Sequence, residues 1–155
     1  MIKCIQKDIT TVERGIIGHG CNASGGFGSG VAGAIRQKWP KCRNEYLKFH
    51  SNYGWCLGDI QIIPVQEDLY VINMITQEKY GYDSKKYAST KAIEETFTKI
   101  CKFSNFTSKY NLPYPIYIPK IGCGLGGLSF ETDVRGILDS VLRNFPNIEV
   151  YVCDL

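Results

Sequence analysis

Two glycine-rich segments constrain this chain more than any other feature, because each lies between a short apolar run and a helical pattern. Both have the spacing G-x-G-x-x-G, first over residues 28–33 and again over residues 122–127. Glycine lets the backbone turn sharply and bring its N–H groups close to a phosphate, and the following helix adds the positive end of its dipole. The two segments predict a site for a diphosphate ligand, formed by loops 25–31 and 122–128. The alternative is that the glycines only make tight turns between strand and helix.

The residues around the first segment exclude two familiar nucleotide-binding motifs. A Rossmann dinucleotide site needs an acidic residue at the end of the next strand, about 20 residues further on. Here residues 45–52 have a helical pattern, and Asp59 begins a strand instead of ending one. A P-loop needs G-K followed by Ser or Thr, and this sequence lacks that motif.

The hydrophobic pattern predicts alternating strands and helices, which is typical of a layered α/β fold, here as one domain over residues 1–155. Ile93, Phe97 and Ile100 form an apolar stripe on one helix. A short polar connection between two neighbouring strands favours a hairpin, so we expect a mixed sheet. The predicted strands are 2–6, 14–18, 59–64, 69–75, 116–118 and 148–152, and the predicted helices are 31–38, 41–50, 87–103 and 131–144.

Composition favours a soluble cytoplasmic protein. The 18 Lys and Arg against 15 Asp and Glu are scattered along the sequence, which does not favour a nucleic-acid-binding domain. The seven cysteines are odd in number and include no C-x-x-C pair, so they fit a reducing compartment better than a disulfide framework or a zinc site. We see no signal peptide and no apolar run of membrane-spanning length, and we expect a monomer without membrane contact.

Several motifs resemble those of the macrodomains, a family that binds ADP-ribose. Residues 7–10 (K-D-I-T) are similar to the family's G-D-I-T element, and residues 19–22 (H-G-C-N) are similar to its N-A-A-N element. Residues 28–35 (G-S-G-V-A-G-A-I) and 118–125 (I-P-K-I-G-C-G-L) are close to its two phosphate loops. The resemblance covers nearly the whole chain. It implies a three-layer α/β/α fold with a mixed sheet of about six strands, and a ligand across the C-terminal edge of that sheet.

The resemblance also implies roles for individual residues. Asp8 would accept the adenine amino group beside Ile9, and Asn22 would contact the distal ribose. The first loop would hold the distal ribose and any 1''-phosphate, and the second loop would hold the diphosphate. The loop residues concerned are Gly28, Ser29, Gly30, Val31, Gly122, Cys123, Gly124, Leu125 and Gly126.

Within the family, H-G-C-N, G-S-G-V-A and I-G-C-G-L-G-G are most similar to the ADP-ribose-1''-phosphate phosphatases and their phage-encoded relatives. This likeness implies a hydrolase without cofactor or metal, in a host cytoplasm if the protein is viral. His19 is the candidate general acid, general base or nucleophile at the terminal phosphate, with Asn22 beside it. The loop amides would stabilise the developing negative charge. The alternative is that His19 only hydrogen-bonds the first loop.

Two other functions remain open from the sequence. One is a non-catalytic reader of ADP-ribose or of ADP-ribosylated protein. The other is a glycohydrolase that removes ADP-ribose from modified proteins, because the sequence is also similar to the terminal ADP-ribose glycohydrolases. Those enzymes use a lysine nucleophile and an aspartate just after I-G-C-G-L. Here Gly126 stands at the aspartate position and Gln77 lies near the lysine position, although Lys79, Lys85 and Lys86 are close in sequence.

Four further side chains have competing interpretations. Cys123 does not favour a cysteine phosphatase, because no arginine follows it in the loop to hold the phosphate. Phe27 could cover the ligand or pack on its own loop. Glu131 and Asp133 fit the start of a helix, where negative charge is stabilising, better than a catalytic pair.

Overall fold

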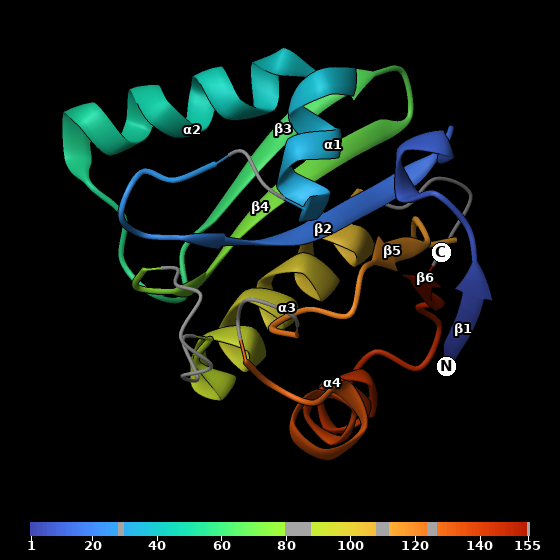
Figure 1. The fold of residues 1–155 in the computed structure, drawn as a ribbon. Helices are drawn as coiled ribbons and strands as arrows, with labels where there is room; N and C mark the ends of the chain where they lie inside the picture. Colours follow the sequence, from blue (N-terminus) through green and yellow to red (C-terminus); the bar gives the residue numbers. More distant parts are fainter. Residues whose placement is uncertain (28–29, 80–87, 108–111, 124–126, 155) are drawn as a thin grey trace.

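The computed structural model describes residues 1–27, 30–79, 88–107, 112–123 and 127–154. Its sheet consists of β1 (Ile2–Gln6), β2 (Gly15–Asn22), β3 (Ile60–Gln66), β4 (Leu69–Gln77), β5 (Ile116–Ile118) and β6 (Val150–Asp154). Its α-helices are α1 (Gly30–Lys38), α2 (Pro40–Tyr53), α3 (Thr90–Phe106) and α4 (Arg135–Leu142). The sheet lies between α1 and α2 on one face and α3 and α4 on the other (Figure 1). The predicted three-layer α/β/α fold is confirmed.

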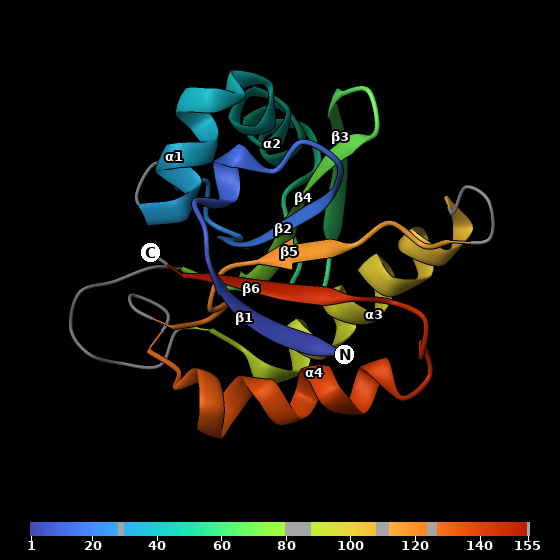
Figure 2. The same ribbon diagram turned by 90° about the vertical axis from the view of Figure 1, so that its right-hand side faces the viewer.

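The strands follow the order β1-β6-β5-β2-β4-β3. All neighbours pair in parallel except β3 and β4, which form the predicted antiparallel hairpin. The neighbours β2 and β5 lie in the middle of the sheet, and the chain leaves them for opposite faces, toward α1 after β2 and toward α4 after β5 (Figure 2). In α/β sheets such a switch point opens a crevice at the carboxyl ends of the strands, where ligands bind.

Each face of the sheet has its own apolar core. On the α3 side, the predicted stripe of Ile93, Phe97 and Ile100 is fully buried against the sheet. On the other side, Ile35 of α1 and Tyr46 of α2 are fully buried. Burial of apolar surface on both faces stabilises the central strands, which explains why β4 reads as a nearly continuous apolar run. Within the described residues, no helix combines the length and the apolar character that crossing a membrane requires.

Several element boundaries differ from the sequence prediction by one to four residues, and three of these differences have a visible structural cause. Strand β2 was predicted over residues 14–18 but continues to Asn22, because its polar second half still pairs with β4. Helix α3 begins at Thr90 instead of residue 87, after Ser89, whose side chain accepts a hydrogen bond from the amide of Ala92. The last helix, predicted as one element over 131–144, starts as a π-helical turn, Phe130–Val134, before α4.

Candidate functional site

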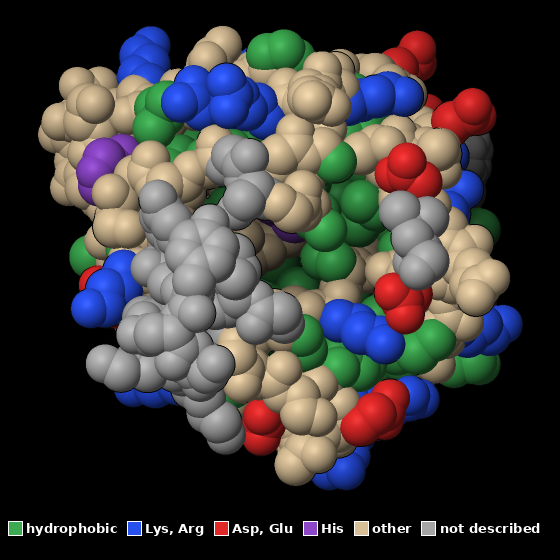
Figure 3. All heavy atoms as spheres, in the orientation of Figure 1, with side chains coloured by type: hydrophobic (Ala, Val, Ile, Leu, Met, Phe, Trp, Pro, Cys, Tyr) green, Lys and Arg blue, Asp and Glu red, His purple; other side chains and the backbone are tan. Residues whose placement is uncertain are grey.

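The predicted binding residues lie in segments that leave the same edge of the sheet. Asp8 follows β1, residues 23–27 follow β2, and residues 119–123 follow β5. Because β2 and β5 are neighbours, the described parts of the two glycine loops are close together. The face of the molecule drawn in Figure 3 is hollowed at its centre. The predicted residues Gly28, Ser29, Gly124, Leu125 and Gly126 lie outside the described part of the chain, as do Lys85 and Lys86.

Asn22 shapes the first loop from within. Its carboxamide Oδ1 accepts hydrogen bonds from the amides of Ser24 and Gly26, both at 3.0 Å, and its Nδ2 donates to the carbonyl of Gly26 at 2.7 Å. A side chain that bonds the backbone a few residues ahead fixes a tight turn. Asn22 therefore holds the loop in shape, and one N–H of its Nδ2 makes no hydrogen bond to a described residue.

Tyr46 of α2 supports the same loop from below. Its hydroxyl donates to the carbonyl of Asn22 at 2.6 Å and accepts from the amide of Gly25 at 3.1 Å. The side chain is fully buried, and burial raises the pKa of its phenol. Its ring stacks on Trp55 and contacts Phe27. Sequence reasoning missed Tyr46, since an aromatic residue on a helix is normally read as core.

Replacement of Tyr46 by Phe should remove both hydrogen bonds and leave the Asn22 carbonyl and the Gly25 amide without this partner. We expect the free energy of unfolding to fall by about 1–3 kcal/mol, measured by urea denaturation. Tyr53→Phe is the matched control, because Tyr53 lies on the same helix and is 78% exposed. Equal stabilities of the two variants would contradict this role for Tyr46.

His19 lies in a buried polar network under the first loop. Its Nε2 is 2.6 Å from Oδ1 of Asn73, whose Nδ2 donates to Oε1 of Gln61 at 3.0 Å. The imidazole is 1% exposed and meets the edge of the Phe27 ring, with 5.4 Å between centroids. Burial lowers the pKa of His19 to about 4, although the bond to Asn73 opposes this shift. The ring is therefore neutral at pH 7, with its Nε2 proton donated to Asn73.

This placement corrects the position expected for His19. A strand that ended at residue 18, as predicted, would place His19 at the edge of the first loop, whereas β2 continues to Asn22. Phe27 is also buried, and its ring packs on His19 of β2 and Tyr46 of α2 instead of projecting as a cover. The catalytic role of His19 stays a prediction, and the burial favours the alternative in which it hydrogen-bonds and supports the loop.

Asp8 lies at the end of the site next to β1, and its carboxylate is ionised at neutral pH. It caps a 3-10 turn, Ile9–Thr11, and its Oδ1 accepts from the amide of Thr10 at 2.9 Å and from the Thr10 hydroxyl at 2.7 Å. These bonds hold the pKa of Asp8 below its usual value. Oδ2 receives no hydrogen bond from the described residues, so it is available to a donor. Ile9 is buried against α1.

The described part of the second loop turns at Gly122, whose φ of 78° is unfavourable for residues with a side chain. The Gly122 carbonyl accepts from the amide of Leu128 at 2.8 Å, which closes the loop. Cys123 is half-buried, and burial raises the pKa of its thiol. A protonated thiol is a poor nucleophile, which agrees with the sequence analysis.

Three other candidate site residues form hydrogen bonds or ion pairs with residues close to them in the sequence. Asp133 accepts a hydrogen bond from the amide of Ser129 at 2.8 Å, at the helix start predicted for it. Glu131 pairs with Arg135 one turn along. Gln77 donates from its side chain to the carbonyl of Lys79 at 2.9 Å. In the described ranges, no three His, Cys, Asp or Glu side chains are grouped so that they could hold a metal.

Comparison with known proteins gives relatives along nearly the full length, although no protein-family model matches the chain. It is 26% identical over 161 residues to the ADP-ribose 1''-phosphate phosphatase of Candida albicans, which covers 98% of this chain and 99% of that protein. It is 29% identical over 147 residues to an uncharacterised 17.5 kDa protein of phage T4, with 90% of this chain and 89% of that protein covered.

Solved structures share the fold. A macrodomain protein from Streptomyces coelicolor superposes with a TM-score of 0.81 at 24% identity and covers 100% of this chain and 99% of its own. Thermosipho africanus DarTG in complex with ADP-ribose gives a TM-score of 0.75 at 17% identity and covers 99% of this chain and 42% of its own. The chain therefore has the fold of the macrodomains and is similar over nearly its full length to a named ADP-ribose 1''-phosphate phosphatase.

Proposed function

We propose that this protein binds ADP-ribose at the carboxyl edge of its sheet and hydrolyses the phosphate of ADP-ribose-1''-phosphate. The observation that carries the proposal is the arrangement of three segments on one edge. An ionised Asp8 follows the outer strand β1, and two glycine loops follow the central neighbours β2 and β5. The likeness to a named ADP-ribose 1''-phosphate phosphatase supports the choice of substrate.

The ligand would lie across this edge with its adenine at Asp8 and Ile9. The free Oδ2 of Asp8 would accept the adenine amino group, and a bond to a charged acceptor is among the stronger kinds. Amides of residues 122–126 would hold the diphosphate. The first loop, with Gly28, Ser29, Gly30 and Val31, would hold the distal ribose and its phosphate. Helix α1 begins at Gly30, so the positive end of its dipole adds to this loop.

The reaction breaks the bond between phosphorus and the ribose oxygen. A water oxygen attacks phosphorus, the ribose oxygen leaves and takes up a proton, and the products are ADP-ribose and inorganic phosphate. Loop amides would stabilise the charge on the phosphoryl oxygens. Asn22 would hold the loop in shape and contact the ribose through its remaining N–H. His19 would exchange a proton with the reacting groups only after Phe27 moves aside, because Phe27 packs on its ring.

Calorimetric titration with ADP-ribose tests the binding step. Wild-type protein should bind saturably, and Asp8→Ala should weaken binding at least about tenfold, because one charge-assisted hydrogen bond contributes about 1.5–3 kcal/mol. Asp139→Ala removes an exposed carboxylate on α4 and should leave the affinity unchanged. Absence of binding to folded wild-type protein would overturn the proposal.

Release of inorganic phosphate from ADP-ribose-1''-phosphate tests the chemical step. Turnover would support the phosphatase. Binding without turnover would instead support a reader of ADP-ribose or of ADP-ribosylated protein, the second candidate, which the burial of His19 favours. The glycohydrolase is the weaker alternative, because Gln77 at the end of β4 is an amide bonded to the backbone and not an amine nucleophile.

A further inference from the structure

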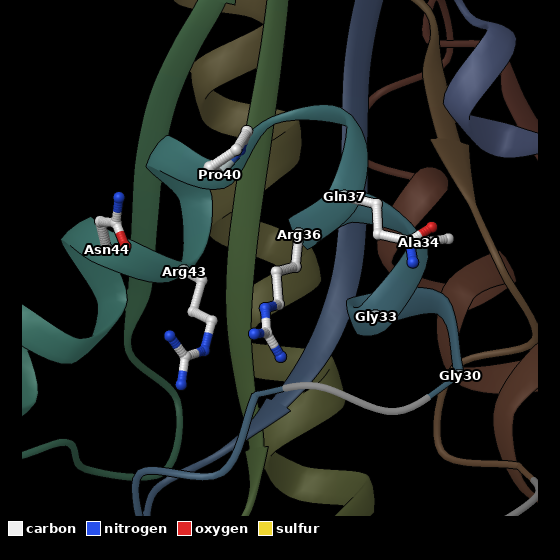
Figure 4. A pocket seen from close by; sticks show the side chains of 8 residues that line it. All are labelled: Gly30, Gly33, Ala34, Arg36, Gln37, Pro40, Arg43 and Asn44. Carbon is white, nitrogen blue, oxygen red and sulfur yellow. The ribbon is translucent and has the colours of Figure 1, made fainter.

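A groove between α1 and α2 borders the first loop at Gly30, and its other lining residues lie outside the proposed ADP-ribose site. It has a volume of about 780 Å³ and is lined by residues of both helices (Figure 4): Gly30, Gly33, Ala34, Arg36 and Gln37 from α1, and Pro40, Arg43 and Asn44 from α2. Small-molecule sites in proteins have volumes of about 300–1,000 Å³. The groove is therefore large enough for a ligand of nucleotide size.

The groove belongs to the most basic segment of the chain. Residues 30–44 contain four of the 18 Lys and Arg and none of the 15 Asp and Glu. Lys and Arg side chains accordingly gather along the top of the face in Figure 3, where α1 and α2 lie. The local charge is thus strongly positive although the whole chain carries only +3. Such a patch attracts anions.

Two arginines in the groove extend toward the same space (Figure 4). Arg43 is half-buried and donates from Nε to the carbonyl of Phe27 at 3.2 Å, and its terminal N–H groups donate to no other residue in the described part of the chain. Arg36 is exposed, and neither arginine forms an ion pair with a carboxylate among the described residues. Two like charges directed at one space repel each other unless an anion lies between them.

We propose that this groove is a second phosphate-binding site, outside the ADP-ribose site, whose ligand is a phosphate monoester of nucleotide size. The flat guanidinium forks of Arg36 and Arg43 match the oxygens of a phosphate group. Asn44 lies at the rim of the groove. Gly33 and Ala34 leave the α1 wall without bulky side chains, so the rest of the ligand lies along that helix. The proposal does not depend on which ligand the edge of the sheet binds.

Titration of ¹⁵N-labelled protein with inorganic phosphate and with AMP, followed by NMR, tests the site. Both probes should shift the amides of residues 33–44 saturably, together with the Nε–H signal of Arg43. Arg36→Gln should weaken these shifts at least about tenfold, which corresponds to about 1.4 kcal/mol. Lys48→Gln is the matched control, because it removes an exposed cation from the same helix outside the groove.

The outcomes are distinguishable. Tighter binding of AMP than of phosphate assigns the groove to a nucleotide, and equal binding assigns it to the phosphate group alone. Shifts confined to residues 8–9, 22–27 and 120–123 would overturn the proposal, since the probes would then occupy only the ADP-ribose site. Shifts in residues 33–44 that do not saturate, or that Lys48→Gln reduces as much as Arg36→Gln, would also overturn it, because they would report general screening of charge.

Discussion

His19→Ala should lower the free energy of unfolding at pH 7 by about 3–5 kcal/mol. The imidazole is fully enclosed, so its removal leaves a cavity beside Phe27 and an unpaired Oδ1 on Asn73. His19→Gln restores a donor near Asn73 and should recover part of this loss. Urea denaturation of the three proteins measures the effect. A loss below about 1 kcal/mol would contradict the buried network.

The difference in the free energy of unfolding between wild type and His19→Ala should depend on pH. The pKa of His19 is lowered from 6.5 to about 4 in the folded protein, so between these values the unfolded chain takes up a proton that the folded chain does not. This part of the stability is complete above pH 6.5 and is lost as the pH falls toward 4. Because His19→Ala removes it, the difference in the free energy of unfolding between wild type and variant should narrow by about 1.6 kcal/mol between pH 6.5 and 5. If this difference stayed constant between pH 6.5 and 5, His19 would take up a proton as readily in the folded protein as in the unfolded chain.

Gly122→Ala should distort the second loop, although the substitution adds only one methyl group. An added Cβ would lie 2.8 Å from Cδ1 of Leu128 and 3.1 Å from Cδ1 of Ile93, at a φ of +78°. We expect a loss of about 1–3 kcal/mol in stability and a fall of at least about tenfold in affinity for ADP-ribose, as the loop shifts to relieve the contacts. Thermal unfolding and calorimetry provide the two measurements.

Gly136→Ala is the matched control for Gly122→Ala. Gly136 lies in α4, and a Cβ there would meet nothing within 4 Å. The same chemical change should therefore stabilise the protein by up to about 1 kcal/mol through helix propensity, with no effect on ligand binding. If both variants lost affinity equally, the special geometry of Gly122 would not be the cause.

The order of the elements could be predicted because its signals are local. The apolar stripe with Ile93 and Phe97 lies within a few turns of one helix, and the glycine loops follow directly on their strands. The short polar connection that contains Asp68, whose φ is 60°, was enough to predict the β3–β4 hairpin. The likeness of the loop motifs to those of macrodomains then implied a three-layer α/β/α fold with a mixed sheet of about six strands.

The buried hydrogen bonds beneath the first loop could not be predicted, because they join residues that are distant in the sequence. Tyr46 bonds a carbonyl 24 residues earlier, and His19 bonds an amide side chain 54 residues later. Neither pair has a spacing that a sequence pattern could reveal. The expected end of β2 was wrong for the same reason: a polar histidine usually ends a buried strand, but Asn73 on the neighbouring strand gives it a partner.

Because β1 and β6 are parallel, the amino end of the chain and its carboxyl end lie at opposite ends of these two strands. This arrangement determines which end is suitable for immobilising the protein. Ile2 pairs with Val150 and the Met1 amine donates to the carbonyl of Ile148, whereas Asp154 pairs with Gln6, two residues before Asp8. The two ends of the chain thus leave from opposite edges of the sheet. Immobilisation through the amino end should leave the ligand edge open to solution. A fluorophore attached near Asp154 should instead report ADP-ribose binding directly, and a bulky fusion there should obstruct it.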